Sequence, residues 1–470
     1  MNTVLINPPL NLDLRQNIFS TQYPLNLGYL GAVLEKNGFS VKLYDYAVEN
    51  FNEEEFLRRI KDDGVRLAGV TAMTNTIISA GRLIRILKKN FPEVTTVLGG
   101  THPTALPERT FEEIPELDYI IMGEGELTLL ELCKTLENSG STGNIQGLAF
   151  REEDGTIVKN PRRPLIEDLD VLPFPSRDLS RPELYCRSHT SRGISRKFLK
   201  IAELMTSRGC PSQCIFCAGH ISYGYRVRFR SAENVLAEAE ECVRKYGIQH
   251  FTILDDTFTL KPERTAAICE GLKKMGATFD CNTRVNAVSR ELIVKMAETG
   301  CKKISFGIES GSQRMLKLIK KGTTVEEIKR AVGWAREAGI HIVEGTFILG
   351  SHPAETRSDI EETLKLMKEL DLDFISYGII VPFPGTEVYE IMLLKGLLSP
   401  KVSWDKFVFA GEPPWRIENF SASELLKIQK RVYREFFLRP GYVLKRIKRT
   451  NIRELKYYSG ALADFIKNLI

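Results

Sequence analysis

The chain has 470 residues, of which 43% are hydrophobic and 27% charged, and a formal net charge of +5. This length is enough for two or three domains. The amino terminus lacks a basic segment followed by a long apolar run, and no stretch is apolar enough to span a bilayer, so we expect a cytoplasmic protein. Nine cysteines, three of them clustered, favour metal ligation over a disulfide framework.

Residues 1–135 alternate short β-branched runs with helical patterns. The predicted strands are Thr3–Asn7, Ser40–Tyr44, Leu67–Thr71, Thr95–Gly99 and Asp118–Met122. Five strands separated by helices predict an α/β domain with a flavodoxin-like, doubly wound parallel sheet that is covered on both faces.

Four of these strands are followed by segments rich in glycine, proline or small polar residues: Asn7–Pro9, Thr71–Thr76, Gly99–Thr104 and Gly123–Glu126. In a doubly wound sheet, ligands bind at the carboxyl ends of the strands, and glycine lets the backbone approach a bulky ligand closely. We therefore expect a binding site at this edge. A bound nucleotide and a set of ordinary turns are the alternatives.

Residues 136–195 contain a small predicted hairpin (Gly147–Arg151 and Ile157–Asn160) and the proline-rich Leu172–Pro175, and we interpret them as a linker. Residues 196–390 alternate strands and helices again. The predicted strands are Leu199–Thr206, His250–Leu254, Thr278–Asn282, Lys303–Gly307, His341–Leu349 and Phe374–Ile380. Six β/α units predict a partial (β/α)6 TIM-type barrel with its functional residues at the carboxyl ends of the strands.

The loop after the first of these strands carries Cys210, Cys214 and Cys217 in a C-x3-C-x2-C pattern. Three thiolates are one fewer than a closed zinc or iron–sulfur site normally uses, so one metal position would stay open for an outside ligand. The alternatives are a zinc site completed by a distant ligand such as His220, and three neighbouring cysteines without a shared role.

The cysteine spacing, with Phe216 just before the last cysteine, resembles that of the radical S-adenosylmethionine (SAM) superfamily. The resemblance implies a four-iron four-sulfur cluster on the three cysteines, an open iron that binds SAM, and reductive cleavage of SAM to a 5′-deoxyadenosyl radical. It also implies SAM contacts from the rim of the barrel, for which the candidates are Phe216, Asp255, Arg284, Glu309 and Ser310. Asp255 and Asp256 have capping of the next segment as an alternative role.

Residues 1–135 resemble the cobalamin-binding domain that precedes many radical SAM domains. The D-x-H-x-x-G signature, which supplies a histidine to cobalt in other proteins, is absent, and His102 lies in G-G-T-H-P-T instead. The likeness is therefore to the subgroup without a histidine below cobalt. The candidate cobalamin contacts are Pro8, Thr71, Met73, Asn75, Gly99, Gly100, His102, Gly123 and Glu124.

Together the two domains resemble the cobalamin-dependent radical SAM enzymes. This resemblance implies methylation of an unactivated carbon through a 5′-deoxyadenosyl radical and methylcobalamin. Ring formation or rearrangement without methyl transfer, and a sensor without turnover, are the alternatives. The expected partners are a small-molecule or lipid substrate and a reductant such as flavodoxin or ferredoxin.

Residues 391–470 are predicted to be a helical region, in which Trp404 and Trp415 either wall the mouth of the barrel or serve as packing. Residues 427–456 hold eleven Lys and Arg against two Glu, a net charge of +9. This segment is either an anion-binding surface, with peripheral membrane contact as one use, or a solvated helical face. Arginines alternate with aromatic residues in Tyr223–Ser231, but this segment caps the next helix, so we expect no nucleic-acid partner.

Overall fold

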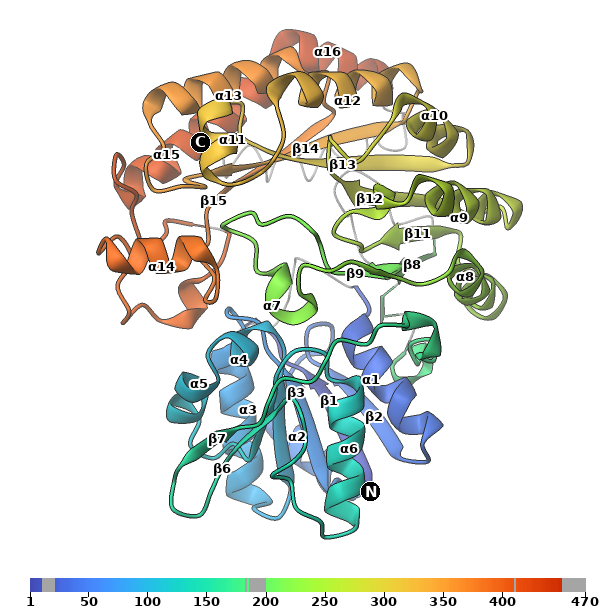
Figure 1. The fold of residues 1–470 in the computed structure, drawn as a ribbon, viewed down its shortest axis with the longest axis vertical. Coiled ribbons are helices and arrows are strands. Elements are labelled where there is room, and N and C mark those ends of the chain that lie inside the picture. Colours follow the sequence, from blue (N-terminus) through green and yellow to red (C-terminus); the bar gives the residue numbers. More distant parts are fainter. Residues whose placement is uncertain (11–21, 182–183, 186–199, 410, 450–470) are drawn as a thin grey trace.

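The computed structural model describes residues 1–10, 22–181, 184–185, 200–409 and 411–449. It consists of two α/β units, one stacked on the other, with a helical carboxyl-terminal region on the second unit (Figure 1). The α/β fold class predicted from the sequence is confirmed for both units.

The first unit is a sheet in which five parallel strands lie in the order β2-β1-β3-β4-β5. Their bounds are β1 Asn2–Asn7, β2 Ser40–Asp45, β3 Leu67–Thr71, β4 Thr95–Gly99 and β5 Tyr119–Ile121. This is the flavodoxin-like order, in which the strand order reverses between β1 and β3. Helices α1 (Leu25–Lys36) and α6 (Glu126–Glu137) cover one face, and α2 (Glu53–Asp62) and α3 (Ile77–Asn90) cover the other.

The predicted hairpin is present, as β6 (Leu148–Arg151) and β7 (Ile157–Lys159). Instead of standing apart in a linker, it pairs antiparallel with β5 and extends the first sheet to seven strands. Sequence periodicity predicts the two strands, but it does not tell which edge they join.

The second unit is a six-stranded parallel sheet in the order β8-β11-β12-β13-β14-β15. Its strands are β8 Ile201–Leu204, β11 His250–Ile253, β12 Thr278–Thr283, β13 Cys301–Glu309, β14 Ile342–Leu349 and β15 Phe374–Ile379. Helices α8 (Ala232–Tyr246), α9 (Pro262–Lys274), α10 (Arg290–Glu298), α12 (Val325–Glu337) and α13 (Arg357–Glu369) pack on the outer face, against buried side chains such as Phe251, Phe279 and Phe306. β8 and β15 are edge strands, so the barrel is partial, as predicted.

The inner face of this sheet is polar. Lys303 of β13 pairs with Glu344 of β14 at 2.8 Å, and both side chains are buried. Asp280 of β12 lies 3.0 Å from the His250 ring of β11. Strand residues alternate between this polar interior and the apolar layer beneath the helices, as the two-residue period of a strand requires.

The carboxyl-terminal region comprises α14 (Glu387–Leu394), the short helix η6 (Trp404–Lys406), α15 (Ala422–Phe437) and α16 (Pro440–Arg449). Both tryptophans are buried: the Trp415 indole donates to the Ile380 carbonyl at 3.0 Å, and the Trp404 indole donates to Glu113 at 2.7 Å. They therefore act as packing, and Trp404 joins this region to the first unit.

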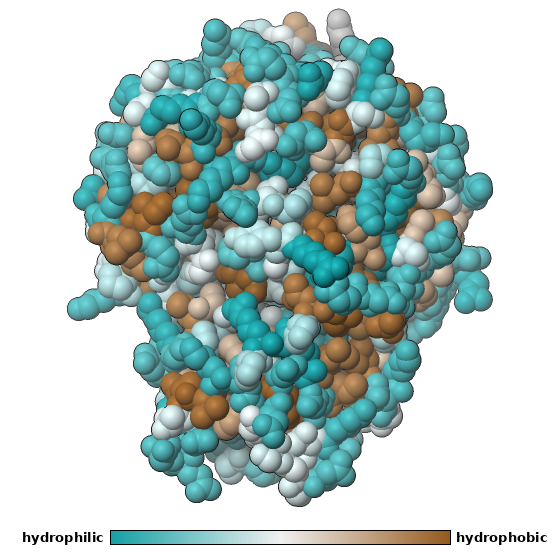
Figure 2. Space-filling model, in the orientation of Figure 1, coloured by the Kyte–Doolittle hydropathy of each residue, from teal (hydrophilic) through white to brown (hydrophobic). Residues whose placement is uncertain are grey.

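The basic segment is not one uniform charged surface. Arg431 pairs with Glu361, Lys445 with Asp371 and Arg446 with Asp373, so three of its cations bind acidic groups of the barrel unit. On the face shown in Figure 2, hydrophilic side chains predominate and apolar residues form separate patches. Among the described residues, no helix is both long and apolar enough to cross a bilayer.

Candidate active site between the two units

The three cysteines predicted to bind the cluster lie on a tightly held loop. It runs from β9 (Ser207–Arg208) to α7 (Gly219–Tyr223), and β9 pairs antiparallel with β10 (Arg228–Phe229). Gly209 has φ +90°, and a Cβ there would lie 2.4 Å from the Arg226 carbonyl oxygen, so only glycine fits just before Cys210. Ile215 donates to the Ile319 carbonyl at 3.2 Å and accepts from the Val388 amide at 3.0 Å. The backbone thus fixes the loop from both sides.

The three cysteine thiols influence one another electrostatically. Burial above all raises the pKa of Cys217 to about 11, and the charges of Asp256, Cys214 and Cys210 add to the shift. Within the described ranges, no three His, Cys, Asp or Glu side chains converge on a single-ion site. Three thiols on one loop are the number of ligands that a four-iron cluster with one open iron would use.

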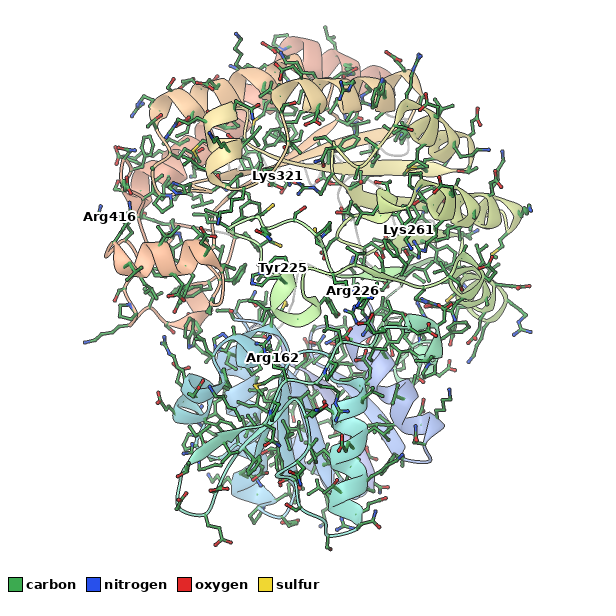
Figure 3. All side chains as sticks on the ribbon, in the orientation of Figure 1. Arg162, Tyr225, Arg226, Lys261, Lys321 and Arg416 are labelled. Carbon is green, nitrogen blue, oxygen red and sulfur yellow. The ribbon has the colours of Figure 1, made fainter. Side chains whose placement is uncertain are left out.

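The zinc alternative finds no support in the position of His220. Its Nδ1 atom lies 2.9 Å from the Cys217 carbonyl oxygen. Its ring stacks on Tyr225, with 4.9 Å between the ring centroids. Figure 3 labels Tyr225 on the loop that follows α7, at the opening between the two units.

Charged groups of the barrel rim gather beside this loop. Arg284, at the end of β12, donates from Nη1 to the Cys214 sulfur at 3.7 Å and from Nη2 to the Lys321 carbonyl. The Lys321 ammonium donates to Glu309 at 2.7 Å, and all three side chains are buried. Lys321, labelled in Figure 3, was not predicted from the sequence.

Glu309 has an unusual backbone conformation. Its φ is +68°, which is strained for a residue other than glycine and occurs mainly at functional sites. A Cβ on Gly307 would lie 2.9 Å from both the Glu309 carboxylate and the Lys321 ammonium, so glycine makes room for this ion pair. The rim thus presents a carboxylate and two cations next to the cysteine loop, as the ammonium and carboxylate of SAM require.

The predicted SAM contact of Asp255 is not supported, because both of its oxygens are already used. They accept from the Thr206 amide at 2.6 Å, the Thr206 hydroxyl at 2.5 Å and the Ser207 hydroxyl at 2.6 Å. Asp255 therefore anchors the start of the cysteine loop, while the neighbouring Asp256 is the exposed carboxylate. Phe216 is half-buried and packs on the apolar core shared by the two units.

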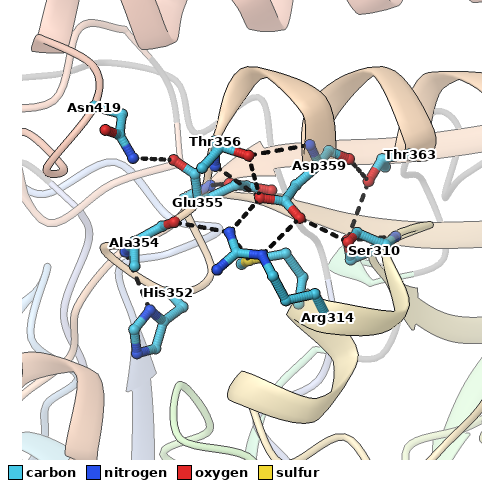
Figure 4. A network of polar contacts seen from close by, with 12 residues as sticks. Ser310, Arg314, His352, Ala354, Glu355, Thr356, Asp359, Thr363 and Asn419 are labelled. Atoms are coloured by element: carbon cyan, nitrogen blue, oxygen red, sulfur yellow. Dashed lines mark hydrogen bonds and ion pairs between the residues drawn. The ribbon is translucent and has the colours of Figure 1, made fainter.

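Ser310 supports the rim from beneath. It is fully buried, its hydroxyl lies 3.1 Å from the Thr363 hydroxyl, and its oxygen accepts from the Ser312 amide at 3.2 Å (Figure 4). Ser312 in turn donates to Asp359 at 2.7 Å. These contacts place Ser310 behind the Glu309 segment, so the predicted contact of its side chain with SAM is not supported.

The same network contains a buried acid, Glu355, whose carboxylate accepts from the Gly350 amide. Burial raises its pKa to about 8, so near neutral pH the group is largely protonated. Asn419 holds the Glu355 carbonyl at 2.9 Å (Figure 4). The loop after β14 is therefore fixed by contacts that do not depend on a ligand.

A cavity of about 590 Å³ opens at the carboxyl ends of β1, β3, β4 and β5. Eight of the nine predicted cobalamin contacts line it: Pro8, Thr71, Met73, Asn75, Gly99, Gly100, Gly123 and Glu124. It extends along the sheet past Leu5, Gly69, Val97 and Ile121. Its size and its largely apolar, glycine-rich wall fit a bulky ligand such as cobalamin.

His102 is the ninth residue predicted to contact cobalamin. It does not line the cavity, so this prediction is corrected. It is buried, its Nδ1 atom lies 3.2 Å from the Thr74 hydroxyl, and its ring lies 4.8 Å from that of Trp404. Burial, with the charge of Arg109, lowers its pKa to about 3. His102 therefore packs against the Met73–Thr76 loop from outside the cavity.

One wall of the cavity was missed by sequence reasoning. Met205, Arg208, Tyr223 and Leu254 of the barrel unit line it together with the first sheet. These residues lie on the segments around the cysteine loop, but contacts between units leave no periodic signal in a single sequence. The cobalamin-type cavity and the cysteine loop thus share a wall.

Comparison with known proteins identifies the class. The profile of the radical SAM superfamily matches residues 204–367, and that of the B12-binding domain matches residues 12–133. An uncharacterized methyltransferase of Pyrococcus horikoshii is 34% identical over 95% of this chain and 95% of its own length. The chain belongs to the cobalamin-dependent radical SAM enzymes, whose cofactors are a four-iron four-sulfur cluster, SAM and cobalamin.

Two further relatives have assigned activities. Cytidylyl-2-hydroxyethylphosphonate methyltransferase of Streptomyces wedmorensis is 29% identical, covering 85% of this chain and 83% of its own. Anaerobic magnesium-protoporphyrin IX monomethyl ester cyclase of Rubrivivax gelatinosus is 28% identical, covering 95% and 79%. The radical SAM methyltransferase TsrM of Kitasatospora setae, solved with cobalamin and a [4Fe-4S] cluster, has the same fold. The TM-score is 0.67 and the sequence identity 20%, and the match covers 85% of this chain and 76% of the TsrM chain.

Proposed function

We propose that this enzyme methylates an unactivated carbon of a small-molecule or lipid substrate. The observation that supports this most is the shared wall between the corrinoid cavity and the cysteine loop. When bound, the cluster and SAM supply a 5′-deoxyadenosyl radical, and cobalamin supplies a metal that carries a methyl group. A substrate held between the two sites would lie within reach of both.

The named activities of the relatives add support. Two of them are called methyltransferases, and one of these is 34% identical over nearly the full chain. The anaerobic cyclase supplies a second candidate function, ring formation without methyl transfer. The two candidates differ in whether a methyl group of SAM appears in the product.

The chain's own residues bind and orient the cofactors in this proposal. Glu309 would accept from the SAM ammonium, Arg284 and Lys321 would hold its carboxylate, and Phe216 would flank its adenine. Glycine and backbone groups at the carboxyl ends of β3 to β5 would hold the corrin. A flavodoxin or ferredoxin supplies the electron.

The proposal is tested with SAM that carries a deuterated methyl group. Anaerobically reconstituted enzyme is given this SAM, a reductant and a metabolite extract from a strain that lacks the gene. Mass spectrometry then follows the label. A small molecule or lipid that gains the deuterated methyl group supports methylation. A product that forms with 5′-deoxyadenosine but without label supports the cyclase-like alternative instead.

For a lipid substrate, we propose peripheral contact with anionic membranes through α15 and α16. Lys427 and Arg434 are exposed on α15, Leu438 is exposed at its end, and Val443 and Leu444 are exposed on α16. Exposed basic and apolar groups together are typical of interfacial helices. Changing Lys427, Lys430 and Arg434 to glutamine should weaken sedimentation with phosphatidylserine vesicles, whereas changing Lys445 and Arg446, which pair with barrel acids, should matter less. If the native protein stays in the supernatant at low salt, the membrane contact is wrong.

A further inference from the structure

A group of buried charges crosses from the first unit to the cysteine loop. Glu124 and Glu126 come from the segment between β5 and α6, and Arg208 comes from β9. Arg208 donates to Glu124 at 2.8 Å and to Glu126 at 2.6 Å. Arg228 of β10 donates to the other Glu124 oxygen at 2.7 Å. All four side chains are at most 9% exposed, so these pairs are far stronger constraints than surface ion pairs.

Backbone groups complete the arrangement. Arg228 also donates to the carbonyls of Ile166 at 2.8 Å and Tyr223 at 3.3 Å, and Glu124 accepts from the Ile166 amide at 2.9 Å. The Tyr29 and Tyr223 rings flank Arg208, at 5.3 and 5.5 Å from its guanidinium carbon. Both oxygens of Glu124 therefore accept hydrogen bonds within the fold, one from Arg208 and the other from Arg228 and the Ile166 amide.

This group of charges lies next to both proposed cofactor sites. Arg208 stands two residues before Cys210, and β9 leads directly into the cysteine loop. Glu124 follows Gly123 at the cavity edge, and Glu124, Glu126 and Arg208 all line the cavity. Glu124 and Arg208 therefore connect the edge of the cavity to the segment that begins the cysteine loop.

The charges of the group balance. Two carboxylates face two guanidiniums, and although burial alone would raise the pKa of Glu124, hydrogen bonds from Arg228 and the charge of Arg208 hold it below its usual value. Removing one partner would leave a buried charge without compensation, whereas removing one of each sign would restore balance. A single substitution and a paired substitution should therefore differ in effect if charge balance matters, and should not differ if only side-chain shape matters.

We infer that Glu124, Glu126, Arg208 and Arg228 form an interdomain lock that sets the position of the cluster relative to the cobalamin. They are positioning residues for the proposed reaction, on which this inference rests, because both sites must serve one substrate carbon. The inference adds a positioning role to Glu124, which lines the cavity and whose contact with cobalamin stays a prediction. It also explains why charged side chains line a cavity that is otherwise apolar.

The test uses the magnetic interaction between the reduced cluster and cob(II)alamin in the holoenzyme, which reports their separation and needs no substrate. Glu124→Gln keeps the shape of the side chain but removes its charge. We expect it to keep iron and cobalamin, to broaden the distribution of cluster–cobalt distances measured by pulsed electron paramagnetic resonance, and to slow SAM cleavage about tenfold. Glu124→Gln with Arg228→Gln should recover part of both losses.

The matched control is Glu167→Gln, which breaks the pair between Glu167 and Arg226, both more than half exposed. It should behave like the native protein. If Glu124→Gln does not fold, Arg208→Lys replaces it, since lysine keeps the charge but cannot bridge both carboxylates. A native-like distance distribution in the lock variant would overturn the inference, and so would loss of cobalamin alone with an unchanged cluster. If the native enzyme transfers no methyl group, the proposed function is wrong, but the distance measurement still tests the lock.

Discussion

The cavity of the first unit and the rim of the barrel are built from different groups. Leu5, Gly69, Gly99 and Gly123 are typical of the cavity, where backbone and apolar side chains leave room for a ligand. At the rim, Glu309 pairs with Lys321, and Arg284 binds the Cys214 sulfur. The first site thus has a wall of backbone and apolar groups, whereas the charged groups of the second pair with one another.

The difference indicates how each ligand binds. A cavity walled by glycine selects by shape, so cobalamin binding should depend on side-chain volume and little on charge. At the rim, SAM must exchange one buried ion pair for others, so its binding should depend on charge. The following predictions separate these two modes.

The largest effect is expected at the cysteine loop. Changing Cys210, Cys214 and Cys217 together to alanine should abolish the brown absorbance of the cluster and all SAM cleavage, because no other described thiol lies on this loop. Iron analysis and 5′-deoxyadenosine formation provide the measurements. Cys133→Ala, which removes a buried thiol of the first unit, should leave both unchanged. A triple variant that retains its iron would contradict the assignment.

A side chain at position 69 should block cobalamin by volume. A Cβ on Gly69 lies 3.1 Å from Leu5 and beside the cavity, so Gly69→Ala should weaken binding slightly and Gly69→Val by about tenfold or more. Cobalamin affinity is read from the absorbance of the protein-bound corrinoid. The cluster content should stay native, and Gly143→Val serves as a control outside the cavity. Equal affinity in all variants would show that the cavity is not the cobalamin site.

Lys321→Met should weaken SAM binding at the rim by removing a charge. It leaves Glu309 buried without its cation, so we expect the SAM KM to rise about tenfold to a hundredfold while the cluster and cobalamin remain bound. The neighbouring Lys320→Met, which removes a half-exposed pair with Glu387, should change KM little. A native KM for the Lys321 variant would mean that SAM binds elsewhere on the rim.

Glu355 makes the support beneath the rim sensitive to pH. Its pKa rises from an ordinary value of 4.5 to about 8 on folding, so the folded protein holds a proton that the unfolded chain releases. This stabilisation is complete below about pH 4.5 and is lost as the pH rises toward 8, at up to roughly 1.4 kcal/mol per pH unit. Glu355→Gln should flatten that part of the stability curve, as measured by thermal unfolding of the apoprotein. Parallel curves for both proteins would contradict the protonated state.

His102→Ala should have the smallest effect on the cofactor. The ring lies outside the cavity, so the cob(II)alamin spectrum should be unchanged and should lack nitrogen splitting from a lower ligand in both proteins. Loss of the buried ring should lower stability by about 1 to 3 kcal/mol. A nitrogen signal in the native protein that vanishes in the variant would show that His102 reaches cobalt.

Much of this architecture could be predicted from the sequence. Strand periods and the glycine-rich strand ends predicted both sheets and eight residues of the cavity, while the cluster role of the three cysteines stays a prediction. The predicted ligand contacts of Asp255, Ser310 and His102 are not supported, because their polar groups bond within the fold. A sequence motif does not tell which way such a polar group turns. Lys321 and Arg208 were missed because their partners lie in distant segments, which only the folded chain brings together.

The proposed methyl transfer requires SAM to serve both as the methyl donor to cobalamin and as the source of the 5′-deoxyadenosyl radical. Its most direct test measures the two products of SAM, S-adenosylhomocysteine and 5′-deoxyadenosine, in reduced enzyme with and without cobalamin and in the presence of a substrate-containing extract. We predict both products in the complete system, S-adenosylhomocysteine only when cobalamin is bound, and neither in the triple cysteine variant. Formation of 5′-deoxyadenosine alone, or of S-adenosylhomocysteine in equal amounts without cobalamin, would contradict the account.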